Sequence, residues 1–295
     1  MNVTTFKTLV LREYWENKSL SRTPVIISCV ILFALIVGMF TAQSFIFSMG
    51  DNQLFLDKGL SEISDANLSE LSQAITGFQY GVFLAPLTIG LIFVLFFYSL
   101  GSLYNDRRDR SILFWKSMPV SDFQTVMSKV FSAFVVAPSL TAAVAVVAQV
   151  VGLVLLTIMV WINGGSAWNI VWSQSSLFTV IFNDFMALFL LALWMAPILG
   201  WLWLVSAYAK KGAFLIAVFV PLGVMLVEGL MLGSAHFGTI IGEHFAQLEY
   251  LGESMVEKGH PFGVFSSTGF WIGLVISAAC IALSVYIRRY RDDSY

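Results

Sequence analysis

Charged residues are scarce in this chain, and their scarcity indicates its class. Asp, Glu, Lys and Arg make up only 12% of the 295 residues. That is about half the share typical of a soluble domain. Hydrophobic residues reach 58%, and the mean hydropathy is +0.83. Long uncharged runs in such a composition argue against a soluble globular protein and predict an integral membrane protein.

The chain has only two cysteines, and no cleavable signal is expected. Cys29 and Cys280 each lie in an apolar run, so we predict two buried apolar thiols rather than a framework of extracellular disulfides. Residues 1–22 mix acidic, basic and polar side chains, and the apolar run that begins at Pro24 is too long for a signal core. We therefore expect this run to be a retained first span.

Motifs for catalysis and metal binding are missing as well. The pattern G-x-x-x-x-G-K-[ST] does not occur, and the pair Gly164-Gly165 lies in an expected outer turn without a lysine. His236, His244 and His260 lack the H-E-x-x-H spacing of a zinc site, so we interpret them as ordinary loop residues. We expect no catalytic, cofactor or metal site in this chain. If ATP drives its function, another subunit must bind ATP and Mg.

Six apolar stretches meet or approach the roughly 20 residues that cross a hydrocarbon core about 30 Å thick. The third and fourth are longer than needed, so we expect them to tilt or bend, with Pro138 and Pro197 as bend points. We predict a single all-α membrane domain over residues 1–295, with spans at about 24–47, 80–103, 130–160, 177–205, 212–232 and 269–287.

The basic residues predict the orientation. Fourteen of the sixteen Lys and Arg fall in segments that an even number of crossings places on one side, and only Lys58 and Lys258 fall on the other. The positive-inside rule then places both termini and the second and fourth connections in the cytoplasm. The fourteen are Lys7, Arg12, Lys18, Arg22, Arg107, Arg108, Arg110, Lys116, Lys129, Lys210, Lys211, Arg288, Arg289 and Arg291.

Two large outer loops, at about 48–79 and 233–268, carry mostly acidic charge. Both contain hydrophobic residues at helical spacing, so they could form short amphipathic helices that cap a pathway. Solvated connectors without substrate contact are the simpler interpretation.

Polar residues inside the spans are candidates for function, because charge at membrane depth is costly. Asp184, with neighbouring Asn183, lies in the fourth run, and Glu228 lies in the fifth. All three lie toward the outer ends of their spans. They could form an outer-vestibule site or gate, and an interfacial carboxylate or a helix–helix hydrogen bond is the alternative.

The connection at about 104–121 is the most informative loop. Asn105 or Asp106 could cap a helix N-terminus, and Ser121 with Gln124 forms a capping-box pattern. We predict a short helix with basic and aromatic faces in a tight turn at the cytoplasmic surface. This shape suits docking to a soluble partner, and contact with anionic lipid is the alternative.

Several residues of this loop form a familiar pattern: Leu103-Tyr104, Asp106-Arg107-Arg108, Arg110-Ser111 and Met118-Pro119-Val120-Ser121. With them, the loop resembles the first cytoplasmic loop of ABC-2-type transporter permeases, which carries a coupling helix. Many members have a Gly after the basic pair, where this chain has Asp109-Arg110-Ser111. The segment Leu9–Trp15 resembles the family's interfacial elbow helix, although Glu13 falls within its apolar face.

The resemblance implies an ABC-2 (type V exporter-like) fold with an N-terminal interfacial helix and a cytoplasmic coupling helix. It implies a permease subunit of an ABC exporter in the bacterial cytoplasmic (inner) membrane, in contact with membrane lipids. Its expected partners are a separate ABC ATP-binding subunit and a second permease copy, identical or different, and we expect no nucleic acid. The implied docking residues are Asp106, Arg107, Arg108 and Arg110, with Phe114 and Trp115 as apolar anchors.

Two other functions compete with this one. An ATP-independent secondary transporter or channel is less favoured, because no repeat of the spans is evident and buried carboxylates are few. A membrane enzyme would need a constellation of catalytic residues that the sequence does not offer. The substrate is open, since an apolar pathway suits a lipid, a peptide, an antibiotic or another amphiphile.

Overall fold

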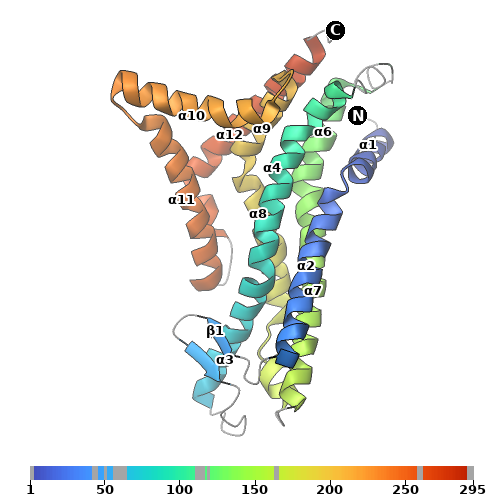
Figure 1. Cartoon of the computed structure of the whole chain (residues 1–295), viewed down its shortest axis with the longest axis vertical. Coiled ribbons are helices and arrows are strands. Elements are labelled where there is room, and N and C mark those ends of the chain that lie inside the picture. The colour runs from blue at the N-terminus through green and yellow to red at the C-terminus, as the bar shows by residue number, and fades with distance from the viewer. Residues whose placement is uncertain are drawn as a thin grey trace. The chain divides into compact units, whose positions relative to one another are not determined.

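The computed structural model describes residues 3–41, 46–49, 52–55, 65–109, 117, 120–162, 166–257 and 262–290. Within these residues the chain consists of helices joined by short connections, and of one strand pair in which β1 (Ile46–Met49) runs antiparallel to β2 (Asn52–Phe55) (Figure 1). The chain is a multi-pass membrane protein, because six helices are long and apolar enough to span a membrane: Ser19–Phe40, Leu71–Arg108, Asp122–Ile162, Leu177–Trp194, Ala213–Leu232 and Thr268–Tyr290.

The first two spans differ from the predicted boundaries. α2 (Ser19–Thr41) ends before Phe47, where we predicted the first span to end, and Phe47 belongs to β1 instead. The second span is longer than predicted, because the hydrophobic spacing of the outer loop continues into it as helix. Three helical segments follow one another there without a loop: α3 (Asp65–Phe78), the π-helical η2 (Gln79–Leu84) and α4 (Ala85–Arg108).

Both predicted bend points coincide with departures from regular α-helix. Just before Pro138, a π-helical stretch, η3 (Ser132–Val136), separates α6 (Asp122–Phe131) from α7 (Ala137–Ile162). At Met195 the fourth span divides into α8 (Leu177–Trp194) and α9 (Ala196–Tyr208), with Pro197 in the first turn of α9. Proline removes a backbone donor and crowds the preceding turn, which is why the helices depart from regularity there.

The chain groups into two compact units, each built from distant segments. Unit 1 comprises residues 1–20, 92–138 and 186–295, and unit 2 comprises residues 21–91 and 139–185. The membrane domain is thus assembled from two units, and the chain passes between them within helices.

Unit 1 is organised around the packing of α9 against α12 (Thr268–Tyr290). A Cβ atom added at Gly200 would lie only 2.9 Å from the Cα atom of Ser277, and one at Gly273 would lie 3.2 Å from Cγ of Pro197. Small residues such as these let helix backbones in a membrane approach closely. α6 contacts both α12 and α1 (Val3–Glu16), so unit 1 brings the first helix and the last span to the same element.

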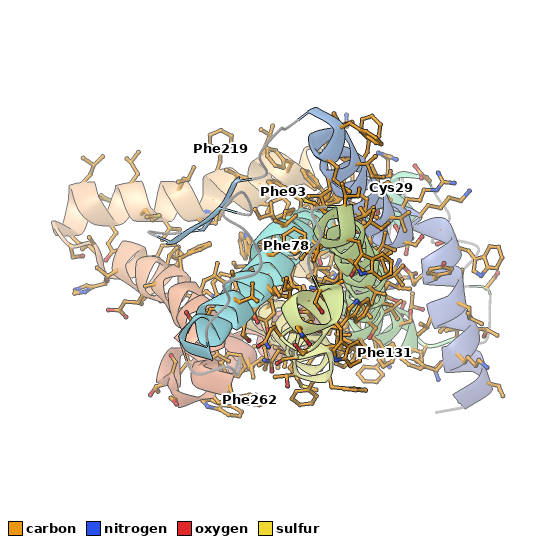
Figure 2. All side chains as sticks on the ribbon, turned by 90° about the horizontal axis from the view of Figure 1, so that it is seen from below. Cys29, Phe78, Phe93, Phe131, Phe219 and Phe262 are labelled. Atoms are coloured by element: carbon orange, nitrogen blue, oxygen red, sulfur yellow. The ribbon has the colours of Figure 1, made fainter. Side chains whose placement is uncertain are left out.

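α10 (Ala213–Leu232) presents apolar side chains on nearly all of its surface. Glycines in the left-handed conformation precede and follow it, Gly212 at φ 63° and Gly233 at φ 59°. Its buried residues are Ala213 and Ala217, and Phe219 stands away from the helix axis (Figure 2). Such a surface is stable when it faces lipid tails.

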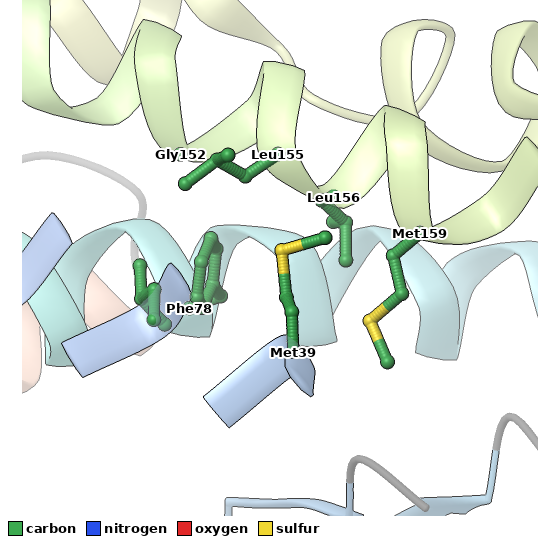
Figure 3. Close-up of a pocket in the computed structure, with 7 residues that line it drawn as sticks. Met39, Phe78, Gly152, Leu155, Leu156 and Met159 are labelled. Carbon is green, nitrogen blue, oxygen red and sulfur yellow. The ribbon is translucent and has the colours of Figure 1, made fainter. Parts of the chain in front are cut away.

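Unit 2 packs α3 and α7 around an apolar cluster that includes Leu71, Ile75 and Leu153, together with the π-helical η4 (Trp168–Trp172). A second cluster forms around Phe78 and is covered by α2. Beside it lies an apolar cavity of about 20 Å³ (Figure 3). That volume holds about one water molecule and has no polar lining, so it is a packing void rather than a substrate site.

The cysteines are less buried than we predicted. Cys29 is exposed on α2, and Cys280 on α12 is partly buried. The apolar runs that contain them form outward surfaces of spans, so their thiols are apolar without being enclosed by protein.

Candidate functional site

Five charged side chains from four helices meet inside unit 1. Lys129 of α6 donates from Nζ to Oε1 of Glu13 in α1 over 2.9 Å, and lies 3.5 Å from Oδ2 of Asp106 in α4. Arg288 of α12 lies 3.4 Å from the same Asp106 oxygen and donates from Nε to Oδ1 of Asp122 over 3.0 Å. We call these five residues the ion network.

The ion network is buried. The side chains of Glu13, Lys129 and Arg288 are 1%, 2% and 4% exposed. Removing a charge from water costs several kcal/mol, so such groups persist only with close, well-oriented partners. Glu13 has them on both oxygens, because the Tyr98 hydroxyl donates to Oε2 over 3.1 Å.

The ion network explains an irregularity in the sequence. Glu13 interrupts the apolar face expected for the N-terminal segment, and in the structure it attaches α1 to α6 through Lys129. A charge inside an apolar helix face signals a buried partner. The partner is 116 positions away, so the sequence pattern identified the anomaly but not the pair.

Asp106 and Arg107 both make contacts within the chain. α4 continues to Arg108, so neither Asn105 nor Asp106 caps a new helix as we predicted. Asp106 is held within the ion network, where both of its basic neighbours belong to unit 1. These contacts position the end of α4, and docking of Asp106 to a partner stays a prediction.

Arg107 binds the end of α9. Its Nη2 donates to the carbonyl oxygens of Ser206 and Ala209, over 2.5 and 2.9 Å. Carbonyls at a helix C-terminus lack partners within the helix and carry the negative end of its dipole, so a guanidinium group is well suited there. Ser206 also accepts from the backbone N–H of Tyr104 over 2.8 Å, which fixes α4 to α9.

Arg108 remains available to a partner. Its side chain is 60% exposed and pairs with Asp109 over 3.0 Å. Arg110, Phe114 and Trp115, the other implied docking residues, lie outside the described residues. The far end of the loop confirms the predicted capping box, because Ser121 accepts from the Gln124 backbone over 3.2 Å and the Gln124 side chain accepts from the Ser121 backbone over 3.3 Å.

Glu228 has a local structural role. Its carboxylate accepts from the backbone N–H groups of His236 and Phe237, over 2.7 and 2.9 Å, and from the Ser234 hydroxyl over 2.9 Å. It therefore caps the N-terminus of α11 (His236–Glu257), which lies in the predicted outer loop. These contacts are hydrogen bonds between helices, the alternative to a gate, and the gate itself stays a prediction.

Asn183 and Asp184 lie together in a polar cluster of unit 2. Asn183 donates from its amide to the Tyr80 hydroxyl over 3.3 Å, and Gln149 donates to the backbone carbonyl of Gln79 over 3.4 Å. Asp184 is fully buried, and among the described residues neither carboxylate oxygen has a partner with hydrogen-bond geometry. The sequence reasoning missed Gln79 and Gln149, although an uncharged amide inside an apolar run is a recognisable signal.

His244 joins α11 to α8 within unit 1. Its ring stacks on Trp194 at 4.8 Å, and the Trp194 indole donates to the His244 carbonyl oxygen over 3.0 Å. Burial lowers the pKa of His244 below its ordinary value. The described part of the chain contains no group of three or more His, Cys, Asp or Glu placed to hold a metal ion.

Comparisons with models of known protein families, with curated proteins and with solved structures found no match. Function must therefore be inferred from the residues and their geometry.

Proposed function

We propose that this chain is the membrane-spanning permease subunit of an ATP-driven exporter of the ABC-2 type. A separate ABC ATP-binding subunit binds ATP and Mg, and two permease copies form the translocation pathway. The observation that carries the proposal is the ion network, because it joins both ends of the loop at 104–121 to the first helix and the last span.

The ion network has the geometry of a mechanical coupling. Arg288 contacts Asp106 at the end of α4 and Asp122 at the start of α6, over 3.4 and 3.0 Å. A displacement of the loop between these helices is therefore transmitted to α12 through the side chain of Arg288. The ion pair between Lys129 and Glu13 transmits it to α1. Buried charge pairs resist separation more than exposed ones, since the surrounding dielectric is low.

The same contacts support the proposed topology. Glu13 of α1 and Arg288 of α12 reach the same Lys129–Asp106 pair, so the beginning and end of the described chain meet within unit 1. Six spans place both ends on the same side of the membrane, as these contacts do. The sorting of Lys and Arg favours the cytoplasmic face for that side, in a bacterial cytoplasmic membrane.

Docking is tested by co-purification. The chain is co-expressed with the ATPase encoded by the neighbouring reading frame and purified through a tag on this chain. We expect a stoichiometric ATPase with the wild type and its loss with Arg108→Glu, which reverses an exposed charge at the loop. Lys7→Glu is the matched control, because Lys7 is an exposed basic residue on α1 and lies outside the loop.

The outcomes separate docking from the proposal as a whole. Retention of the ATPase by Arg108→Glu would move the docking contact away from Arg108. Absence of the ATPase from folded wild-type protein would overturn the exporter proposal, and the lack of any ATPase gene beside this one would weaken it.

An ATP-independent secondary transporter or channel is the second candidate. Asp184 favours it, because an intramembrane carboxylate without a partner is typical of ion-coupled pathways. Transport by the purified chain in liposomes, driven by an ion gradient without ATPase, would distinguish this candidate from the first.

A further inference from the structure

Asp184 and Gln79 of unit 2 are buried, and their side chains have no hydrogen-bond partner among the described residues. Both carboxylate oxygens of Asp184 and both side-chain polar atoms of Gln79 lack hydrogen bonds among the described residues, and both residues are 0% exposed. Buried polar groups are nearly always satisfied, so each such exception needs an explanation. Two of them in one polar cluster indicate a shared site.

Three elements bring these groups together. Gln149 of α7 donates to the backbone carbonyl of Gln79 and also interacts with Asp184 of α8, although it misses hydrogen-bond geometry there. Tyr80 lies within electrostatic reach of Asp184 and accepts a hydrogen bond from Asn183. Gln79 and Tyr80 open the π-helical η2, a geometry that occurs frequently at functional sites.

Charge identifies the missing partner. An isolated carboxylate in an apolar medium is highly unfavourable, so it must bind a proton or a compensating cation. Among the described residues, the side chains that interact with Asp184 are the Gln149 amide from α7 and the Tyr80 phenol from η2, and neither is a cation. One carboxylate balances one positive charge, and the side chain of Gln79, whose backbone carbonyl binds Gln149, offers an unoccupied amide oxygen as a further acceptor.

We propose that Asp184, with the Gln79 and Gln149 amides, binds a single monovalent cationic group within the membrane. The group is an inorganic ion such as Na⁺ or the ammonium of an organic substrate, since both prefer oxygen acceptors around one negative charge. A divalent metal site is disfavoured, because the described residues hold no cluster of three acidic or histidine ligands. The site does not depend on an ATPase, so it holds for either transport mechanism.

Equilibrium binding to the purified full chain in nanodiscs tests the proposal. The probes are radiolabelled Na⁺ and radiolabelled methylammonium, each measured at several pH values. We expect one of them to bind saturably at one site per chain. Its affinity should rise with pH, because a proton competes for the Asp184 carboxylate. Na⁺ alone would identify an ion site, and methylammonium would identify a site for organic amines.

The variants make the result specific. Asp184→Asn keeps the shape of the side chain and removes its charge, so we expect at least a tenfold loss of affinity. Gln79→Leu should weaken binding less. Glu228→Gln is the matched control, because it removes an intramembrane carboxylate that is already satisfied at the α11 cap.

Two results would overturn the proposal. In the first, neither probe binds saturably at any pH, and infrared spectroscopy shows that Asp184 is protonated throughout. The other is equal binding by the wild type and Asp184→Asn. Infrared spectroscopy reads the protonation of Asp184 directly, so the test does not depend on knowing the transported substrate.

Discussion

In unit 1, the buried charges of Glu13, Lys129 and Arg288 each lie within 3.5 Å of an opposite charge. In unit 2, Asp184 is at least as deeply buried and has no such partner among the described residues. The helices differ as well, because α1 and α6 carry many polar residues whereas α7 and α8 are almost wholly apolar.

The ion network has the features of a structural contact between helices, whereas Asp184 has those of a binding site. Partners that satisfy a buried charge hold helices together, and the ion network does so for α1, α4, α6 and α12. A buried charge without a partner adds no attachment and costs stability. Such a group is more typical of a site that acquires its partner from outside.

Removal of Lys129 should have the largest effect. Lys129→Met leaves Glu13 buried without its main partner, and breaking a buried ion pair costs about 3–5 kcal/mol. The midpoint of thermal or denaturant unfolding in detergent should fall sharply. Lys7→Met, an exposed change on α1, should leave it unaltered. If Lys129→Met is equally neutral, the ion network contributes little to stability.

Removal of Asp106 should have a smaller effect in the same direction. In Asp106→Asn, Lys129 keeps Glu13 and Arg288 keeps Asp122, so the loss is that of one partner, about 1–3 kcal/mol. A double-mutant cycle between Asp106→Asn and Arg288→Met measures the coupling directly. If the stability losses of the two variants add, the 3.4 Å contact between Asp106 and Arg288 has no coupling energy.

Asp184→Asn should change stability in the opposite direction. In cation-free buffer the variant removes an unsatisfied charge, so we expect a gain of about 1 kcal/mol or no change. The measurement is the unfolding midpoint with and without the bound cation, which should stabilise only the wild type. A loss comparable with that of Lys129→Met would show that Asp184 has a fixed partner in the protein.

The smallest expected effect is the pH dependence at His244. Burial lowers the pKa of the folded imidazole, so the folded state favours the neutral ring. The contribution of the neutral ring to the free energy of unfolding is complete above the unfolded-state pKa of about 6.5. It is lost as the pH falls toward the lower pKa of the folded state. Half-exposure screens the effect to below about 1 kcal/mol. His244→Phe keeps the ring stacking on Trp194. We expect its unfolding midpoint to change less than that of the wild type between pH 7 and 5.

Local patterns predicted much of the fold. The capping box at Ser121 and Gln124 and the irregularities near Pro138 and Pro197 follow from short-range stereochemistry, and the structure contains all of them. The cap expected at Asn105 or Asp106 was wrong, because good capping residues also occur inside helices when tertiary partners use their side chains. Asp106 has two such partners.

The candidate sites were less predictable than the helices. Asn183, Asp184 and Glu228 were grouped because all are polar residues in apolar runs. The structure places Asp184 with Gln149, whereas Glu228 caps α11. Polarity at membrane depth indicates that a partner is needed, but it carries no information about which partner or ligand meets that need.

By itself the sequence determined the membrane class, the approximate spans and the capped start of α6, because these depend on composition and on neighbours within a few residues. The tertiary structure decided which charges are paired. Glu13 and Lys129 are 116 positions apart, and Asp106 and Arg288 are 182 positions apart. Ion pairing requires an approach to about 4 Å. Only the packing of the helices brings such distant residues that close, and among the described residues it leaves Asp184 without an oppositely charged partner.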